Sequence, residues 1–407
     1  MTGTVIVGAS VGGVRTAQSL RAAGYEGDIV LVDEQDRAPY DKPPLSKQIL
    51  TGEWSFDRIA LLSPSMCEEL RIDLRLGDRA VAVDPAAQVV ELASGDRVGY
   101  ETLVVATGAH ARPSPWQVAD RVFVLRTVDD AEAIAAAFRA GGKVVVVGGG
   151  FIGSEVATAA HRCGAAVTVV DPFEAPLSRA VGSALGGWLA QRAVDYGVSV
   201  QFGHGVEEIV SESGGVTVVL TSGTRLSADY AVVGIGAVPN DAWLTTSGLS
   251  LDGGVLCDEF GRAVGSDSVY AVGDVACWFD PDSGGYRRVE HWTNTVDQAA
   301  CVGHNIVNPE TPKAHRASGY VWSDQYGVTV QTVGRTTGNL REDWIGDFTT
   351  HGRFAVIFSD TDGTLRGAAT VDWPRALLRC RRALAGETPA ADLVEQLLSD
   401  IPHGAVK

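Results

Sequence analysis

The sequence contains one pattern twice: an apolar strand, a glycine-rich turn, a helix and a second apolar strand that ends in an acid. The first copy begins at residues 4–13 (TVIVGASVGG), and its second strand ends at Asp33 and Glu34. The second copy begins at residues 143–153 (KVVVVGGGFIG) and ends at Asp171. Continuous runs of Val and Ile are typical of parallel strands that are covered on both faces. The repeat therefore predicts an α/β fold with two parallel sheets.

Each glycine turn leads into a predicted helix, over residues 14–23 and 154–163. In such a turn the first glycine permits the tight bend, the middle one admits a diphosphate, and the last lets helix and strand pack closely. The second copy fits at Gly148, Gly150 and Gly153, whereas the first has Gly8 and Gly13 with Ser10 at the middle position. Because a serine side chain is small, it hinders the approach of a phosphate without blocking it. Two Rossmann-like dinucleotide-binding domains are therefore expected.

Asp171 indicates which nicotinamide coenzyme the second domain binds. An acid at this strand end accepts hydrogen bonds from a ribose hydroxyl and disfavours a 2′-phosphate. Neither Arg nor Lys follows directly in residues 172–174. The sequence therefore favours NAD over NADP.

Composition limits the binding partners and the cellular location that we expect for the protein. The 407 residues carry 33 Lys and Arg against 50 Asp and Glu, a formal net charge of −17 that opposes nucleic-acid binding. No apolar stretch approaches the ~20 residues of a membrane span. The N-terminus leads directly into a strand pattern without a charged leader, so we expect a cytoplasmic protein. The six cysteines show no short metal-ligand spacing, so we expect no metal site and unpaired thiols.

Several motifs resemble known flavoproteins. Residues 103–109 and 268–274, with the first repeat, resemble the flavin half of glutathione-reductase-type enzymes. The match is narrowed to NADH-dependent ferredoxin reductases of cytochrome P450 and Rieske oxygenase systems, which are putidaredoxin reductase-like, by residues 39–47 (PYDKPPLSK), 125–131 (LRTVDDA), 288–294 (RVEHWTN) and 321–326 (VWSDQY). This resemblance covers essentially the whole chain. It implies FAD and NADH as cofactors and a 2Fe-2S ferredoxin as partner.

The resemblance also assigns catalytic roles. Lys47 corresponds to a lysine near the flavin ring, where a cation stabilises the reduced flavin. Glu155 corresponds to a glutamate between nicotinamide and flavin, although it could instead be an acid that the helix dipole favours in a first turn. Phe151 resembles an aromatic gate over the nicotinamide pocket.

On the flavin side, the resemblance implies that Glu34 binds the adenosine ribose, although Asp33 could serve. Asp274 would bind the ribityl chain, whereas Lys42 replaces an arginine that is common in the family. Arg126 would contact the flavin cofactor, with a surface ion pair as the alternative. Trp292 would lie on the isoalloxazine ring, with a core position as the alternative. The full set of expected cofactor-binding residues is Gly8, Ser10, Gly12, Gly13, Glu34, Lys42, Lys47, Ala80, Ala106, Thr107, Gly108, Arg126, Asp274, Trp292, Gly148, Gly149, Gly150, Phe151, Ile152, Gly153, Glu155, Asp171, Arg179 and Gly236.

Residues 38–60 contain no cysteine, which excludes a dithiol relay of the disulfide-reductase kind at that place. Two other functions stay open. One is an NADH oxidase or rubredoxin reductase of the same fold, and the other is a non-catalytic flavin-binding interaction protein.

The expected FAD-binding domain comprises residues 1–110 and 238–312, with an NAD-binding domain at 111–237. A turn is expected at residues 238–240. Residues 313–407 would form a smaller α+β C-terminal domain that docks the ferredoxin. Because the chain is acidic, docking would use a local basic patch, or else shape and apolar contacts; the arginine candidates are Arg335, Arg341, Arg375, Arg379, Arg381 and Arg382, with Arg287 and Arg288 as the alternative. If residues 375–382 are helical, Arg375, Arg379 and Arg382 share one face, which could equally be a solvated or ion-paired surface.

Overall fold

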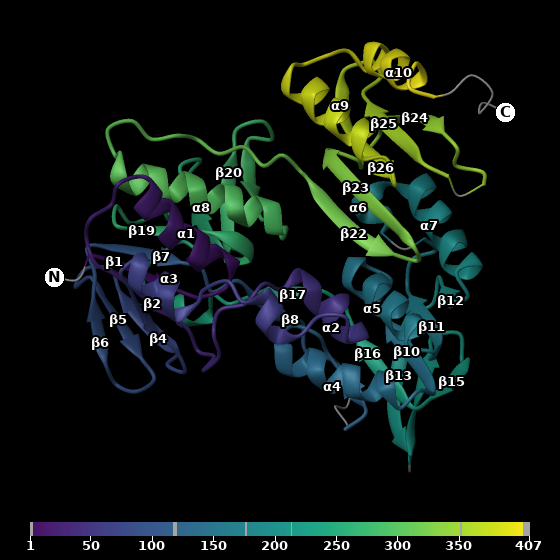
Figure 1. Ribbon diagram of the computed structural model, residues 1–407, viewed down its shortest axis with the longest axis horizontal. Coiled ribbons are helices and arrows are strands. Elements are labelled where there is room, and N and C mark those ends of the chain that lie inside the picture. Colours follow the sequence, from purple (N-terminus) through teal and green to yellow (C-terminus); the bar gives the residue numbers. More distant parts are fainter. Residues whose placement is uncertain (1–2, 117–119, 176, 213, 351, 402–407) are drawn as a thin grey trace. The chain divides into compact units, whose positions relative to one another are not determined.

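The computed structural model describes residues 3–116, 120–175, 177–212, 214–350 and 352–401 (Figure 1). By its contacts the chain divides into two units. The first unit comprises residues 1–43, 55–110 and 237–317, and the second comprises residues 44–54, 111–236 and 318–407. The short segment 44–54 thus belongs to the second unit although both flanking stretches belong to the first. The three-domain division expected from the sequence remains a prediction.

The first unit is built on a five-stranded parallel sheet in the order β19-β7-β1-β2-β3. Its strands are β19 (Val269–Ala271), β7 (Thr102–Val105), β1 (Thr4–Val7), β2 (Ile29–Val32) and β3 (Ile72–Arg75). Val5 of the central strand lies opposite Val30 on one side and Leu103 on the other. Helix α1 (Val11–Ala22) follows β1 and packs against α8 (Trp292–Val307).

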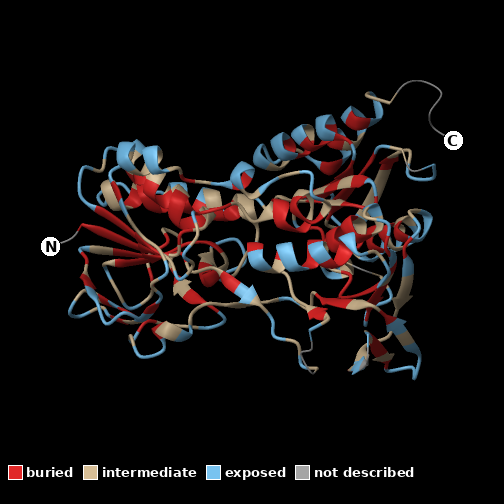
Figure 2. Cartoon of the chain, turned by 60° about the horizontal axis from the view of Figure 1, so that its bottom comes forward, coloured by how far each residue is buried: buried red, intermediate tan, exposed pale blue. Residues whose placement is uncertain are grey.

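The second unit contains the other copy of the repeat. Its parallel sheet has the order β12-β11-β10-β16-β9. The strands are β12 (Ser199–Phe202), β11 (Ala166–Asp171), β10 (Lys143–Val147), β16 (Tyr230–Val233) and β9 (Val122–Phe123). Helix α5 (Phe151–Arg162) connects β10 to β11, and α4 (Val128–Arg139) precedes β10. Figure 2 shows that the central strands of the parallel sheets are buried.

The second unit also contains an antiparallel sheet in the order β22-β23-β26-β25-β24. Its strands are β22 (Val321–Gln325), β23 (Val328–Gly334), β24 (Arg341–Gly346), β25 (Phe354–Ser359) and β26 (Leu365–Val371). One face packs on α9 (Pro374–Ala385) and α10 (Ala390–Leu398), and the other packs on residues of α6 (Ser178–Val181) and α7 (Ser183–Asp195). This arrangement buries both faces of β25. The predicted fold, two dinucleotide-binding folds and a smaller α+β part, is confirmed.

The remaining elements are short. They are η1 (Pro43–Ser46), α2 (Gln48–Thr51), η2 (Phe56–Ile59), α3 (Pro64–Glu69), β4 (Ala80–Asp84), β5 (Val89–Leu92), β6 (Arg97–Gly99), β8 (Ala109–Ala111), β13 (Val206–Glu212), β14 (Gly215–Leu220), β15 (Arg225–Ala228), β17 (Ala237–Pro239), η3 (Ala242–Leu244), β18 (Val255–Cys257), η4 (Gly273–Val275), β20 (Ala276–Asp280) and β21 (Gly285–Arg287).

Two local predictions were wrong. The turn expected at residues 238–240 is in part the strand β17, which pairs with β8. Helices α1 and α5 begin three residues earlier than predicted, at Val11 and Phe151, because Ser10 and Gly150 are their N-caps. The last glycines of both turns therefore lie inside the first helical turn.

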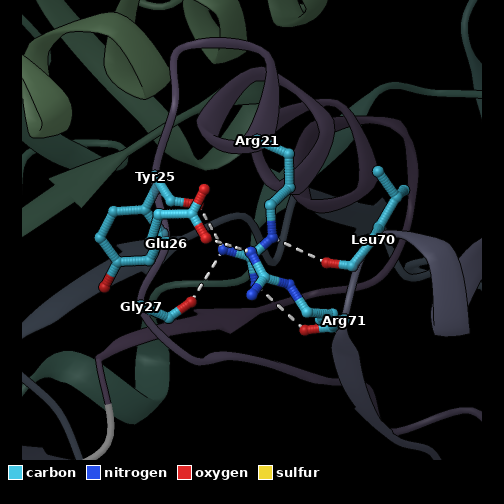
Figure 3. A network of polar contacts seen from close by, with 6 residues as sticks. All are labelled: Arg21, Tyr25, Glu26, Gly27, Leu70 and Arg71. Carbon is cyan, nitrogen blue, oxygen red and sulfur yellow. Dashed lines mark hydrogen bonds and ion pairs between the residues drawn. The ribbon is translucent and has the colours of Figure 1, made fainter.

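An arginine fixes the end of α1 in the first unit (Figure 3). Arg21 donates through Nε to the Leu70 carbonyl at 2.7 Å and through Nη1 to the carbonyls of Tyr25 and Gly27 at 2.6 and 2.8 Å. Its Nη2 donates to the Arg71 carbonyl at 3.1 Å. One guanidinium thus ties α1 to the turn before β2 and to the residues before β3.

All six cysteines are free thiols. Among the described residues, no helix is both long and apolar enough to cross a membrane. No group of His, Cys, Asp and Glu in the described part of the chain has the arrangement of a metal site.

Candidate functional site

The first glycine of each turn is required by close backbone approach. Gly8 has φ +107°, and a Cβ there would lie 2.3 Å from the carbonyl oxygen of Ala106. Gly148 has φ +109°, and a Cβ there would lie 2.2 Å from the carbonyl oxygen of Gly234. Any other residue would clash with the neighbouring strand end in each unit. The turns are therefore built alike in the two copies.

The middle positions differ in a way that fits a phosphate ligand. A Cβ on Gly150 would meet no atom within 4 Å, so the N-terminus of α5 faces open space. Ser10 is the N-cap residue of α1, and its hydroxyl is buried without a hydrogen-bond partner among the residues that the structure describes. Neither helix has an acid in its first turn. Helix N-termini with free N–H groups bind phosphates, and the unpaired Ser10 hydroxyl adds a donor in the first unit. Both turns fit a dinucleotide diphosphate.

The acids that end the second strands brace these turns. Asp33 accepts the N–H of Ala9 at 2.6 Å and that of Gln35 at 2.9 Å. Asp171 accepts the N–H of Gly149 at 2.7 Å and that of Phe173 at 2.9 Å. The sequence predicted ribose binding at this position but missed the bracing. The repeat itself held the signal, because Asp33 and Asp171 occupy equivalent places.

A surface hollow of the first unit lies directly at its glycine turn. Lys42 lies over the Tyr40 ring at 5.0 Å, and the Tyr40 hydroxyl donates to Gln35. Glu34, the expected ribose acid, is exposed between Asp33 and Gln35. The hollow is lined by Ala9, Ser10, Asp33, Gln35, Arg37, Pro39, Tyr40 and Lys42. It brings together Ser10 and Lys42, two residues that the sequence singled out.

Four further predicted residues of the flavin half lie at strand ends of the first unit. Thr107 donates to the Asn240 carbonyl at 2.8 Å, which ties the turn of Ala106, Thr107 and Gly108 to the residue after β17. Asp274 lies in η4, beside Gly273, whose N–H donates to Gln298. These turns follow the adjacent strands β7 and β19.

Trp292 opens α8 and donates from Nε1 to Asp41 at 2.8 Å. Burial raises the pKa of Asp41, and this hydrogen bond opposes the shift. Gly12 lies in the first turn of α1, where a Cβ would lie 3.3 Å from a Thr295 methyl group. Ala80 lies elsewhere, at the start of β4 in a small antiparallel sheet.

A buried polar cluster forms around Glu155 in the second unit. Glu155 is the fifth residue of α5 and only 4% exposed. Its Oε2 lies 2.9 Å from Lys47 Nζ and accepts the Ser46 hydroxyl at 2.5 Å. Its Oε1 accepts the Ser323 hydroxyl at 2.7 Å. The carboxylate is therefore a paired, buried group, and the alternative of a first-turn acid favoured by the dipole does not hold.

The segment 44–54 positions Lys47 and Ser46. Lys47 is the N-cap of α2, directly after the 3₁₀ turn η1 that Pro43 and Pro44 begin. The end of the segment is fixed to α5, because Glu53 pairs with Arg162 and Cys163 donates to the Leu50 carbonyl. Sequence reasoning predicted Lys47 and Glu155 but missed Ser46 and Ser323, although both lie within quoted motifs.

The other predicted residues of the second unit lie at separate places along its chain. Phe151 opens α5 and is partly buried, whereas Ile152 is 48% exposed. Arg179 lies over the Phe173 ring at 4.4 Å, in the stretch after Asp171. Gly236 is exposed with φ +110°, and Arg126 directly precedes Thr127, the N-cap of α4.

Two of the four arginines in the basic cluster of α9 are ion-paired within the chain. Residues 375–382 are helical as expected, but Arg379 and Arg375 both approach Asp400, at 2.9 and 3.5 Å. Arg381 lies over the Tyr320 ring. Of the two readings left open by the sequence, the intramolecular ion-pair surface therefore describes Arg375 and Arg379. Arg382 is exposed.

Comparison with known proteins gives the family. Residues 2–299 match the family model of pyridine nucleotide-disulphide oxidoreductases, and residues 320–397 match the reductase C-terminal model. The chain is 35% identical to rhodocoxin reductase of Rhodococcus erythropolis over 95% of this chain and 90% of that protein. It is 34% identical to the anthranilate 1,2-dioxygenase system ferredoxin–NAD(+) reductase component of Burkholderia cepacia, over 94% and 93% of the chains.

Among solved structures, the chain is similar to the covalent putidaredoxin reductase–putidaredoxin complex. The TM-score is 0.92 at 29% identity, and the match covers 99% of both chains. These matches extend over nearly the whole chain. The glycine turns and the buried Lys47–Glu155 pair are consistent with the family that the matches indicate. The chain belongs to the pyridine nucleotide-disulphide oxidoreductase family, among the ferredoxin reductases that carry the reductase C-terminal domain.

Proposed function

We propose that this chain is an FAD-dependent enzyme that transfers electrons from NADH to a 2Fe-2S ferredoxin, which in turn supplies a cytochrome P450 or a Rieske oxygenase. The observation that carries the proposal is the buried Lys47–Glu155 ion pair, at 2.9 Å, on the helix that follows the second glycine turn. A buried lysine–glutamate pair on the helix that follows a dinucleotide-binding turn indicates a functional site rather than a surface contact. Family membership supports the same reaction.

The residues of each unit take separate tasks in this proposal. In the first unit, the turn from Gly8 to Gly13 and the Ser10 hydroxyl hold the diphosphate of FAD. In the second unit, the turn from Gly148 to Gly153 holds the diphosphate of NADH. FAD, when bound, supplies the hydride acceptance and single-electron release that no side chain provides.

Lys47 and Glu155 act by charge and position. Lys47 keeps a cation at the site, where it favours negative charge on a reduced ring. Glu155 orients the nicotinamide and, through the ion pair, fixes Lys47. Orientation contributes much of the rate in such a transfer, since the chemistry belongs to the cofactors. The chain would act in the cytoplasm, where NADH and a ferredoxin are both available.

The test begins with the purified, flavin-loaded protein under anaerobic conditions. Stoichiometric NADH should bleach the visible flavin absorbance within the dead time of manual mixing. Addition of a 2Fe-2S ferredoxin should then make cytochrome c reduction depend on the ferredoxin concentration.

Two outcomes would contradict the proposal, and each would indicate a different function. Rapid oxygen consumption without any acceptor protein, and no stimulation by ferredoxins, would indicate an NADH oxidase. Flavin that NADH does not reduce would indicate a flavin-binding interaction protein.

A further inference from the structure

We infer that Ser323, a residue of the reductase C-terminal domain, is a positioning residue for Glu155 and thereby for the hydride step. The inference rests on the proposed function. Ser323 lies in β22, more than 160 residues after Glu155 in the sequence, and is completely buried. The C-terminal domain would thus take part in the chemistry of the nicotinamide side as well as in any docking of a partner protein.

The two oxygens of Glu155 are held unequally. Oε2 has two partners, the Lys47 ammonium and the Ser46 hydroxyl. Oε1 has the Ser323 hydroxyl as its one hydrogen-bond donor within the described residues. A buried carboxylate oxygen that loses its donor pays the full cost of desolvation, whereas one that keeps a charged partner does not. Loss of Ser323 should therefore disturb Glu155 more than loss of Ser46.

The strand that carries Ser323 is itself fixed to α5. The backbone N–H of Tyr326, directly after β22, donates to the Thr158 hydroxyl at 2.8 Å. Thr158 lies three residues after Glu155 and donates in turn to the Ser154 carbonyl. The β22–β23 hairpin is thus attached to α5 at two points on one helix face. Only the Ser323 contact reaches the carboxylate, so the two attachments can be separated by mutation.

The experiment compares four single variants of the flavin-loaded enzyme: Ser323→Ala, Ser46→Ala, Glu155→Gln and Thr158→Val. The measured quantity is the rate constant of flavin reduction at saturating NADH, with the NADH dissociation constant from the same traces. Ser323→Ala should lower the rate constant about tenfold, and Ser46→Ala should lower it less. Thr158→Val is the matched control, because it removes the other hairpin attachment without touching Glu155. It should stay within about twofold of the wild type.

A double-mutant cycle then separates positioning from packing. In the Glu155→Gln background, Ser323→Ala should cost less than about twofold in rate, because the carboxylate that it orients is gone. The same cycle is measured on the urea midpoint of unfolding, without NADH, to report the contact itself. Coupling in the unfolding midpoint shows that Ser323 and Glu155 interact in solution.

Three results would overturn the inference. One is a wild-type reduction rate for Ser323→Ala, and another is an equal loss in both backgrounds. The third is a loss in Thr158→Val as large as that in Ser323→Ala, which would make hairpin docking the cause. Failure of the proposed function is a different result: NADH would then not reduce the flavin of the wild type, whatever the unfolding cycle gives.

Discussion

We expect Asp171 to combine two tasks that substitutions can separate, bracing of the turn and selection of the coenzyme. Its carboxylate accepts the N–H groups of Gly149 and Phe173, and it is 8% exposed at the expected ribose end of β11. A negative charge there repels a 2′-phosphate, while the two accepted hydrogen bonds shape the turn. We therefore predict that coenzyme choice depends on the same side chain that shapes the turn.

We predict that the wild type prefers NADH over NADPH by on the order of 100-fold in kcat/KM, which corresponds to ~2–3 kcal/mol. Asp171→Asn removes the charge and one of the two acceptors, so it should narrow the preference at a smaller cost in stability than the loss of both acceptors. Asp171→Ala removes the bracing too and should also lower Tm. Steady-state kinetics with both coenzymes and thermal unfolding check this. Comparable kcat/KM values for the two coenzymes in the wild type would refute the assignment.

Ser10 is the residue at which the first turn departs from the glycine pattern. Its buried, unpaired hydroxyl suits a phosphate oxygen. We predict that Ser10→Ala raises the Kd for FAD about fivefold, since one hydrogen bond contributes ~1 kcal/mol. Ser10→Gly is the control for size, because it lacks the hydroxyl but leaves more room. Equal weakening in both variants, measured by flavin release on dialysis, assigns the effect to the hydroxyl. Unchanged retention in both would remove Ser10 from the site.

At the scale of elements, the end of α1 depends on one side chain. Arg21 donates to four carbonyl oxygens in two loops that lead into β2 and β3 (Figure 3). Loss of the guanidinium would leave these carbonyls without their donor at a helix end.

We predict that Arg21→Ala lowers the free energy of unfolding by about 2–3 kcal/mol, because bonds to a charged donor are lost together. Arg21→Lys should recover little of this, since an ammonium lacks the planar set of donors. The neighbouring Arg71→Ala is the control, because its pair with Glu26 is exposed to solvent and contributes little to stability. Urea unfolding measures all three variants, and equal losses for Arg21→Ala and Arg71→Ala would contradict the prediction.

The whole molecule carries a net charge of −17, which opposes association with an acidic ferredoxin. A docking patch must therefore be locally basic or apolar. Arg375 and Arg379 are both paired with Asp400, which offsets part of their charge, so they are poor candidates for ferredoxin docking. Arg382 on the same helix is exposed, as is Leu378.

We predict that Arg382→Glu raises the KM for ferredoxin about threefold at low ionic strength, with NADH-to-ferricyanide turnover unchanged. Arg225→Glu makes the same change in net charge at an exposed position of β15, outside residues 320–397, and is the matched control. If both variants raise KM equally, only net charge matters. If Arg382→Glu has no effect, the docking surface moves to Arg287 and Arg288 beside the flavin motif.

The sequence by itself determined the two dinucleotide-binding folds and the glycines that make them. Unbroken Val and Ile strands and the glycine turns are local signals, because a tight bend and a covered strand impose their residue types directly. Lys47 and Glu155 are also predicted as site residues, but through the resemblance of their motifs to a family and not through spacing. The sequence predicts the helix starts three residues too late, because glycines such as Gly12 and Gly13 are typical of turns although here they are helical.

Tertiary structure alone decided which residues surround the buried carboxylate. Ser46, Lys47 and Ser323 come from segments more than 100 residues from Glu155 in the sequence. No local sequence pattern marks a hydroxyl that donates to a distant carboxylate. Its partner is selected by the packing between α5, β22 and the segment 44–54. The same reason explains why the bracing by Asp33 and Asp171 and the pairing of Arg379 with Asp400 were visible only once the chain was folded.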